Sequence, residues 1–160
     1  MIIRPASPSD ANAIWSILEP TIRAGETYTL PRDMDREQAL AYWFSPDHTV
    51  FVVEDEGEIL GSYYLRPNQK AGGAHVGNCG YMTAQNAVGR GIATAMCRHS
   101  LEHARSQGFL ALQFNFVICT NLPAIHLWRK FGFEQVGRIP NAFLHPNLGY
   151  VDALVMYRTL

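Results

Sequence analysis

The sequence predicts a single domain of the mixed α/β (α+β) class, with a mostly antiparallel sheet of about seven strands and helices on both faces. Three observations predict it. The length of 160 residues fits one domain, residues 1–160. Hydrophobic residues make up 48% of the chain and charged residues 17%, an ordinary balance for a protein with a buried core. Stretches with strand and helix periodicity follow one another in the order β-α-α-β-β-β-α-β-α-β-β.

The N-terminal segment is expected to form a short strand and a first helix. Residues 2–6 read as the strand, and Ser7 is a suitable N-cap for the helix that follows. Because proline lacks a backbone N–H, Pro20 should kink or interrupt this helix. The apolar residues that recur at helical spacing are Ala11, Ile14, Trp15, Leu18 and Ile22.

A second helix and a hairpin come next. The helix lies within residues 30–44, with Asp33 or Asp35 as its cap. Residues 49–67 contain two β-rich runs around "EDEGE", and Gly57 supplies the turn between them.

The middle of the chain predicts a strand, a glycine-rich turn and a long helix. Residues 74–83 read as the strand, in which Gly77 and Gly80 indicate a bulge or a close backbone approach. Residues 90–108 read as the helix, which ends at Gly108.

The C-terminal third predicts three strands and a short helix. The first strand is expected at 109–118 and the helix at 121–132. The last two strands are expected at 133–139 and 150–160. The segment between them, 140–150, contains two prolines and is interpreted as an irregular loop that covers a binding site or mediates dimer contacts.

The turn in "QNAVGRGIATAM", residues 85–96, is a candidate anion site. A strand, a glycine turn and a helix N-terminus together present several free backbone N–H groups and a partial positive charge. Gly89 and Gly91 would let a phosphate approach the backbone with no Cβ in the way. By itself, the turn fits a tight strand-to-helix connection equally well.

Two common nucleotide motifs fit this turn poorly. A Walker loop ends in Gly-Lys-Ser/Thr, whereas this stretch has "GIAT". A dinucleotide fingerprint needs an acidic residue closing the next strand, and "FLALQFNFVI" has no carboxylate.

Two segments resemble the signatures of the GNAT acetyltransferase superfamily. "AVGRGIATAM" resembles its pyrophosphate loop, usually Arg/Gln-x-x-Gly-x-Gly/Ala, and "NLPAIHLWRKFGFEQVGR" resembles its Asn-x-x-Ala-…-Tyr-…-Gly-Phe motif. The element order matches as well. The resemblance implies a splayed parallel strand pair in the middle of the sheet and acetyl-CoA as co-substrate. The cofactor-binding residues it implies are Tyr81, Met82, Thr83, Val88, Gly89, Arg90, Gly91, Ile92, Ala93, Thr94 and Asn121.

Two departures from the family pattern bear on function. Val88 is interpreted as the replacement of the loop's usual Arg or Gln, which should weaken cofactor binding only modestly. Trp128 stands where the family usually has a tyrosine that protonates the leaving thiolate. An indole N–H cannot play that role, but a thiol with a pKa near about 8.5 can leave without a dedicated acid.

The catalytic candidates are two asparagines on the strands that should splay. Asn78 and Asn115 are unusual in strands, and buried amides need partners. From about residue 75 onward, the sequence is similar to yeast-type proline-analogue (azetidine-2-carboxylate) acetyltransferases, which implies that Asn78, Asn115 and Asn121 bind substrate and stabilise the reaction centre. The oxyanion would meet backbone N–H groups around residues 81–83.

The acceptor is expected to be a small-molecule amine, an amino or imino acid. Arg66 and Asn68 are the candidates for binding its carboxylate, and a solvated strand end is the alternative for Arg66. The general base is unassigned: His75 is a candidate, although strand alternation places it opposite Asn78, and water is an equal alternative. A protein or peptide N-acetyltransferase and a non-catalytic acyl-CoA-binding module stay as alternatives.

Composition limits the other partners. A net charge of −1 gives no basic footprint for nucleic acid, and no apolar run approaches a membrane span of about 20 residues. Three cysteines with no zinc spacing favour a reducing cytoplasm. His99 and His103 lie one helical turn apart, but a solvated helix face is favoured over a metal site, and none is predicted. A homodimer is an open expectation.

Overall fold

The computed structural model describes residues 1–160 and confirms the predicted fold class and element order. All seven strands form one sheet in the order β1-β2-β3-β4-β5-β7-β6. The strands are β1 (Ile2–Pro5), β2 (Thr49–Asp55), β3 (Glu58–Pro67), β4 (Val76–Thr83), β5 (Ala111–Ile118), β6 (Glu134–His145) and β7 (Gly149–Thr159). The helices are α1 (Ala11–Ala24), α2 (Arg36–Trp43), α3 (Ile92–Ser106) and α4 (Leu122–Lys130).

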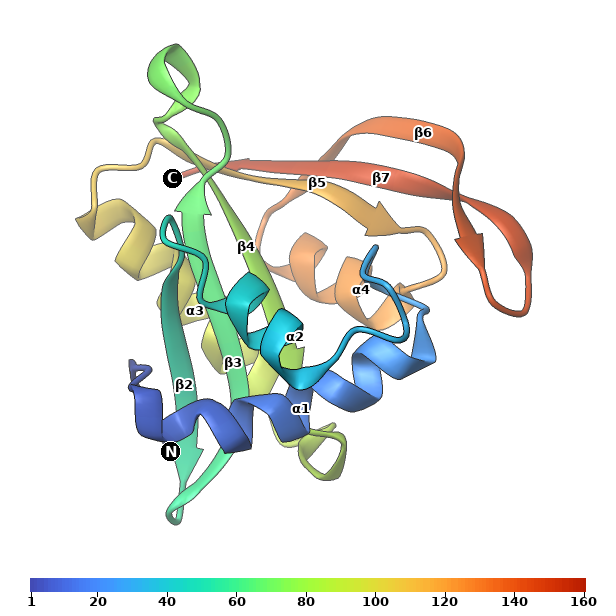
Figure 1. The fold of residues 1–160 in the computed structure, drawn as a ribbon. Helices are drawn as coiled ribbons and strands as arrows, with labels where there is room; N and C mark the ends of the chain where they lie inside the picture. Colours follow the sequence, from blue (N-terminus) through green and yellow to red (C-terminus); the bar gives the residue numbers. More distant parts are fainter.

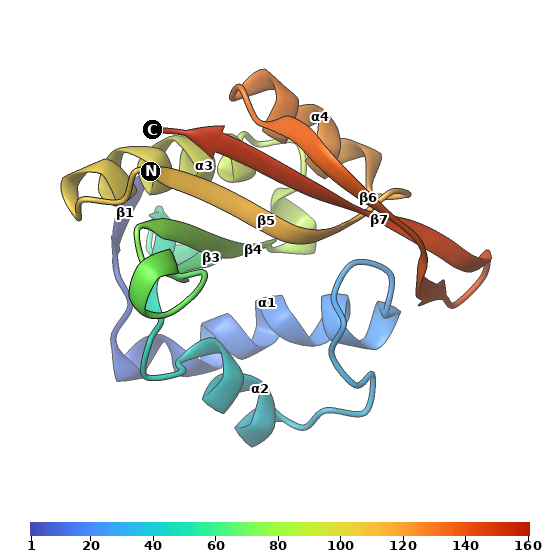
Figure 2. The ribbon, with the colours of Figure 1, turned by 90° about the horizontal axis from the view of Figure 1, so that it is seen from above.

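The helices cover the sheet in two layers. Helices α1 and α2 lie on one face, and α3 and α4 lie on the other (Figures 1 and 2). Each face has its own apolar core, one built around Trp43 of α2 and one around Met96 of α3. A ligand that is to touch both cores must therefore pass through the sheet.

Strands β4 and β5 form the only parallel pair in the sheet. Their ladder contains two residue pairs, Val76 with Ala111 and Gly77 with Leu112. Beyond these pairs the two strands separate toward α4 (Figure 1). The predicted splayed parallel pair is thus present in the middle of the sheet.

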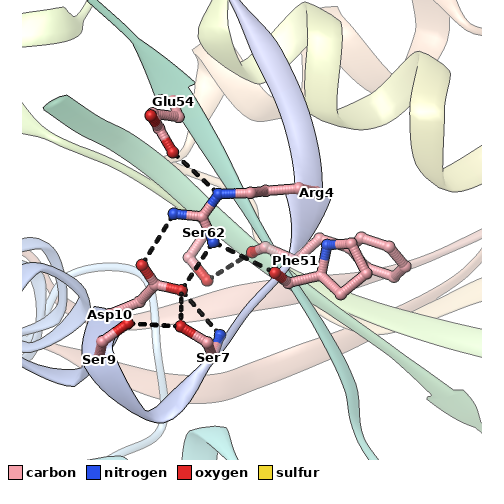
Figure 3. A network of polar contacts seen from close by, with 8 residues as sticks. Arg4, Ser7, Ser9, Asp10, Phe51, Glu54 and Ser62 are labelled. Atoms are coloured by element: carbon pink, nitrogen blue, oxygen red, sulfur yellow. Dashed lines mark hydrogen bonds and ion pairs between the residues drawn. The ribbon is translucent and has the colours of Figure 1, made fainter. Parts of the chain in front are cut away.

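A charged network at the outer corner of the sheet fixes the start of α1 (Figure 3). The Ser7 N–H donates to the buried Asp10 carboxylate at 2.7 Å, as a capping box requires, within a 3₁₀ turn that leads into the helix. The Arg4 guanidinium donates to both Asp10 oxygens, at 2.8 and 2.9 Å, and to Glu54 at 2.8 Å. The network joins β1, α1 and β2 through residues far apart in the sequence.

Pro20 does not interrupt the first helix, because α1 continues to Ala24 with the proline inside it. Tertiary packing explains this, since Leu18 and Ile22 on either side of Pro20 are buried. The cap of α2 is Asp35, whose carboxylate accepts from the Gln38 N–H at 2.8 Å.

The interpretation of 140–150 as an irregular loop is wrong. Strand β6 continues to His145 and pairs with β7 across a tight turn, so that the segment forms a hairpin arm (Figures 1 and 2). Pro140 is tolerated because β6 is the edge strand, where a missing N–H costs no ladder bond. The register shifts between Ile139 and Phe143, and Asn141 there has a positive φ of 50°.

Gly77 and Gly80 of β4 lie where neighbouring side chains approach the strand backbone closely, and no bulge occurs there. A Cβ on Gly80 would lie 2.5 Å from the Tyr64 ring, and one on Gly77 would lie 2.7 Å from the Leu112 side chain. The register between β3 and β4 is unbroken from Gly61 to Pro67. Tight packing on each face of β4 therefore requires glycine at both positions.

Candidate active site

The point where β4 leaves β5 is bridged by a side chain. One residue beyond the last ladder pair, Asn78 Nδ2 donates to the main-chain carbonyl of Gln113 at 2.9 Å. A carbonyl oxygen can only accept, so the orientation of this amide is fixed and Oδ1 of Asn78 is left for another donor. Asn78 replaces the backbone bond that the diverging strands can no longer make.

Beyond this bridge, the edge of β4 that faces β5 forms no hydrogen bonds with another strand. The Asn68 N–H donates to Val76 O at 2.8 Å, so the even-numbered residues of β4 are the ones that bond to β3. The N–H and C=O groups of Tyr81 and Thr83 therefore point toward the gap. Met82 is even-numbered and its polar groups belong to the β3 ladder, which removes it from the predicted main-chain donors.

A cavity of about 290 Å³ occupies the gap between β4 and β5. It draws its walls from both faces of the sheet, because it includes Tyr28 and Tyr64 from the α1/α2 core and Phe114 and Trp128 from the α3/α4 core. Its lining residues are Thr27, Tyr28, Thr29, Tyr42, Tyr64, Arg66, Asn78, Cys79, Gly80, Tyr81, Phe114, Asn115, Phe116, Val117, Ile118, Asn121, Ala124 and Trp128.

The second predicted asparagine belongs to a chain of amides along this cavity. Asn115 Oδ1 accepts from Gln113 Nε2 at 2.9 Å, and Asn115 Nδ2 donates to Asn68 Oδ1 at 2.6 Å. Gln113 therefore contacts both asparagines, Asn115 through its side chain and Asn78 through its carbonyl. Sequence reasoning missed Gln113; its position two residues before Asn115, on the same strand face, was the available signal. Asn115 lines the cavity, whereas Gln113 and Asn68 do not and hold it from outside.

Arg66 supplies the positive charge of the cavity. Its Nε atom is buried and has no hydrogen-bond partner, and its guanidinium lies 3.7 Å from the half-exposed Asp47 carboxylate. A buried N–H without a partner is rare and needs an explanation. The Nε atom is closed off by its surroundings, so the terminal N–H groups of the guanidinium are the donors left for an anion in the cavity.

Three tyrosines form the wall on the α1/α2 side. Tyr42 and Tyr64 hydroxyls lie 3.1 Å apart, and the Tyr28 hydroxyl donates to Tyr81 O at 2.9 Å. Burial raises the pKa of Tyr28 and of Tyr64 above the ordinary tyrosine value. These hydroxyls stay protonated at neutral pH and act as neutral hydrogen-bonding groups.

The glycine turn leads directly into α3. Gly89 and Gly91 both have positive φ angles, 84° and 82°, and a Cβ on either would meet no atom within 4 Å. The helix begins at Ile92, so the N–H groups of Ile92, Ala93 and Thr94 have no intrahelical acceptor. The turn therefore combines open space, free donors and the positive end of a helix dipole.

Some of the predicted donors in this turn are already occupied. The Arg90 N–H donates to Ala87 O at 3.1 Å and the Val88 N–H to Gln85 O at 3.5 Å. Gly89, Gly91 and the first turn of α3 remain as main-chain donors. The Arg90 side chain is free of this turn and pairs with Asp55 at 3.2 Å.

The family motif places its Arg or Gln three positions before the first glycine, which is Asn86 and not Val88. The Asn86 side chain donates to Glu58 at 3.2 Å. The Val88 side chain is 74% exposed beside the turn. The departure from the motif is therefore a change from a longer side chain to asparagine.

Trp128 and Asn121 lie at the α4 end of the cavity. The Trp128 indole is buried against Tyr81, with ring centroids 4.9 Å apart, and against Phe114 at 4.8 Å. Asn121 caps α4 by accepting from the Ala124 N–H at 3.4 Å. Both residues line the cavity, and Asn121 also has this structural role.

The structure bears on two hypotheses about histidines, His75 as a general base and the His99/His103 face of α3 as solvated. His75 is exposed at the start of β4 and does not line the cavity. This position argues against His75 as the general base. His99 is half-buried, since its Nδ1 lies 2.6 Å from the Tyr63 hydroxyl and its ring packs on Phe51. The face that carries His99 and His103 is therefore more packed than the predicted solvated face.

Known acetyltransferases are similar to this chain in sequence and in fold. The sequence model of the acetyltransferase (GNAT) family matches residues 12–133. N-acetyltransferase aca1 of Schizosaccharomyces pombe is 28% identical, over 84% of this chain and 72% of that protein. The L-amino acid N-acetyltransferase AaaT of Escherichia coli is 27% identical, over 99% and 97%. The solved structure of a GCN5-related N-acetyltransferase from Kribbella flavida has a TM-score of 0.94 and 39% identity, covering 99% and 97%. No helix of the chain is long and apolar enough to cross a membrane.

Proposed function

This chain belongs to the GNAT family of acetyltransferases, and from that premise we propose that it transfers acetyl from acetyl-CoA to the amine of a small amino or imino acid. The observation that carries the proposal is the cavity between β4 and β5. It opens one path through the sheet, so a cofactor and an acceptor could meet there from opposite faces. Direct attack in a ternary complex follows from such an arrangement.

The cofactor half of the proposal rests on main-chain groups. The pyrophosphate would accept from Gly89, Gly91 and the first turn of α3, whose N–H groups lack protein acceptors. The pantetheine arm would run along the unpaired edge of β4, past Thr83 and Tyr81. This course leads from the glycine turn to the cavity, because that edge connects the two.

The chemistry needs few side chains. The amine nitrogen attacks the thioester carbon, and the developing oxyanion meets the Tyr81 N–H at the edge of the gap. Asn78 and Asn115 would hold the acceptor amine and the reaction centre with their fixed amides. The thiolate leaves with a pKa near about 8.5 and takes its proton from solvent, so Trp128 has no acid role.

The acceptor half of the proposal rests on Arg66. Arg66 lines the cavity, and the terminal N–H groups of its guanidinium suit the carboxylate of an amino or imino acid. The name of the AaaT relative, an L-amino acid N-acetyltransferase, supports this substrate class.

Two other functions remain as competitors. A protein or peptide N-acetyltransferase would need an open groove, whereas the tyrosines of α2 and β3 close one side of this cavity. None of residues 140–150 lines the cavity, so the hairpin arm of a single chain does not shape it. A non-catalytic acyl-CoA-binding module would keep the glycine turn and bind the cofactor without turnover.

The test is release of free thiol from acetyl-CoA with a panel of amines. The panel contains azetidine-2-carboxylate, proline analogues, common amino acids, polyamines and N-terminal peptides. We expect turnover with amino or imino acids and none with their carboxamides. Turnover with peptides alone would identify a protein acetyltransferase. Silence with every amine, together with tight acetyl-CoA binding by calorimetry, would identify the binding module.

A further inference from the structure

The charge content of the cavity is simple. Arg66 is its one charged side chain, and its other polar side chains are amides and hydroxyls together with one thiol. Burial raises the pKa of the Cys79 thiol to about 12 and holds the pKa of Tyr81 well above its ordinary value. At neutral pH, the wall of the cavity therefore carries one positive charge.

Two titratable side chains, His48 and Asp47, lie next to this wall without lining the cavity. His48 stacks on Tyr64 with ring centroids 3.9 Å apart, and its Nδ1 lies 2.9 Å from Trp43 O. Burial lowers the pKa of His48, and its side chain is 4% exposed. The half-exposed Asp47 carboxylate lies 3.7 Å from the Arg66 guanidinium. Neither His48 nor Asp47 lines the cavity.

The remaining elements around the cavity contribute amides, hydroxyls, apolar side chains and the Trp128 indole. Strand β5 presents Asn115 and apolar side chains, and α4 presents Ala124 and Trp128. The segment after α1 presents Thr27 and Thr29 beside the protonated Tyr28. Tyr42 of α2 shares its hydroxyl hydrogen bond with Tyr64.

We propose that the acceptor enters this cavity as an anion, with its carboxylate ionised and its amine already neutral. The inference rests on the function proposed above and specifies the ionic form of its substrate. A net negative acceptor matches the Arg66 charge, whereas a zwitterion would bring an ammonium group out of water beside a cation. The Oδ1 of Asn78 accepts one N–H of the neutral amine and directs the nitrogen lone pair away from itself.

The reaction balances without a basic side chain. The nitrogen lone pair forms the N–C bond, and the C–S bond breaks with its electron pair going to sulfur. The nitrogen then carries one proton too many, and this proton passes through solvent to the thiolate. The ammonium proton of the free acceptor was lost to bulk water before binding. The net result is one amide and one CoA thiol.

The pH profile of the reaction should therefore follow the amine pKa of the acceptor. No ionisable group of the protein should contribute to it. The ratio kcat/KM should rise about tenfold per pH unit until the pH reaches that pKa, because only the neutral amine binds. Once the acceptor is bound, its amine is neutral at every pH, so kcat should be flat over the same range.

The experiment compares acceptors of one shape and different basicity. Proline and thiazolidine-4-carboxylate share ring size and carboxylate, but the ring sulfur lowers the amine pKa. Alanine and β-cyanoalanine serve in the same way if primary amines turn over. We expect the midpoint of the kcat/KM profile to move with the acceptor pKa, and the less basic partner to be the better substrate at neutral pH.

Two results would overturn the inference while leaving the transferase activity intact. One is a common midpoint for both acceptors, which would reveal an enzyme base. The other is a kcat that rises with pH. The variants His48→Gln and Asp47→Asn test the nearest candidates for such a base, and we expect the midpoint to stay unchanged in both. Absence of turnover with every amine at every pH would instead contradict the proposed function itself.

Discussion

The two halves of the site are built in different ways. The proposed cofactor half consists of main-chain N–H groups of Gly89, Gly91 and the first turn of α3, together with the free edge of β4. The acceptor half consists of side chains from separate elements, among them Tyr28, Arg66 and Asn115. A main-chain site depends on local backbone conformation, whereas a side-chain site depends on how distant elements pack.

The difference determines which substitutions should matter. In the cofactor half, a side chain should be harmful when it is added in the open space that the pyrophosphate would occupy, and the identities of most side chains there should matter little. In the acceptor half, a side chain is harmful when it is removed, because each one has a specific contact. The two halves should therefore separate in kinetics, with cofactor affinity responding to the first and turnover or acceptor KM to the second.

The largest effect is expected from Gly91→Glu. The new side chain would enter the open space beside the turn and place a negative charge at the proposed pyrophosphate site. Isothermal calorimetry should show CoA affinity lowered beyond detection. Gly108→Glu is the control, because Gly108 has a similar φ of 84° and open surroundings at the other end of α3. Equal loss in both variants, or retained affinity in Gly91→Glu, would refute the assignment of the turn.

The next largest effect is expected from Asn115→Ala. Loss of this amide breaks the chain of hydrogen bonds from Gln113 to Asn68 at the reaction centre. Turnover should fall by about 10²-fold to 10³-fold, the range for a donor that acts on the transition state. The CoA affinity should change little. Asn147→Ala, at the exposed tip of the hairpin arm, should have wild-type kinetics, and unchanged kinetics in Asn115→Ala would remove this residue from the site.

A smaller effect, confined to the acceptor, is expected from Arg66→Gln. The neutral side chain loses the charge-assisted hydrogen bonds to the carboxylate, worth a factor of about 10 to 100 in acceptor KM. CoA affinity should not move, which separates this residue from the cofactor half. Arg98→Gln on the exposed surface of α3 is the matched control. A lowered kcat with an unchanged acceptor KM would contradict the role given to Arg66.

Trp128→Phe should have a still smaller effect. The indole is packed among the Tyr81 and Phe114 rings, and phenylalanine keeps most of these contacts. Activity should stay within about tenfold of wild type, measured by thiol release at saturating acetyl-CoA. A loss of about 10³-fold would be of the size of general acid catalysis and would show that Trp128 takes part in proton transfer.

The smallest effect on activity is expected from Asp10→Asn, which lies outside both halves. The Arg4 guanidinium holds the pKa of the Asp10 carboxyl well below its ordinary value. A lowered folded-state pKa stabilises the fold above the unfolded value of about 3.9, and this stability is lost as the pH falls toward the folded pKa. Asp10→Asn should cost about 1–3 kcal/mol in urea unfolding at pH 7 and leave kcat unchanged there.

Acid titration of the same variant gives a second readout. Between about pH 5 and pH 2, the wild type should lose stability more steeply than Asp10→Asn, because only the wild type protonates this carboxyl. Equal slopes would show that the Arg4–Asp10 pair has no net role in folding.

The same contrast explains what the sequence could predict. The element order and the glycine turn come from local patterns, the splayed pair was implied by the resemblance to the GNAT superfamily, and the structure has all three. Asn78 and Asn115 were found because an asparagine within a strand is unusual. Gln113 was missed because its bond to Asn115 depends on the strand face, and a glutamine in a strand attracts little attention.

The failed prediction for 140–150 has a different physical cause. Proline and asparagine argue against a strand in general, but an edge strand tolerates both where its N–H groups face solvent. Edge position is a property of the whole sheet, so the local sequence could not reveal it. For the same reason, the unpartnered Nε of Arg66 became visible only with the packing around it.

The most direct test of the account is a crystal structure of the protein with acetyl-CoA. The pyrophosphate should accept hydrogen bonds from the N–H groups of Gly91 and the first turn of α3. The thioester should lie inside the cavity beside Tyr81 and Asn78. The acetyl carbonyl should lie within hydrogen-bond distance of the Tyr81 N–H. A cofactor whose thioester lies outside the gap between β4 and β5 would contradict the claim that the two substrates meet through the sheet.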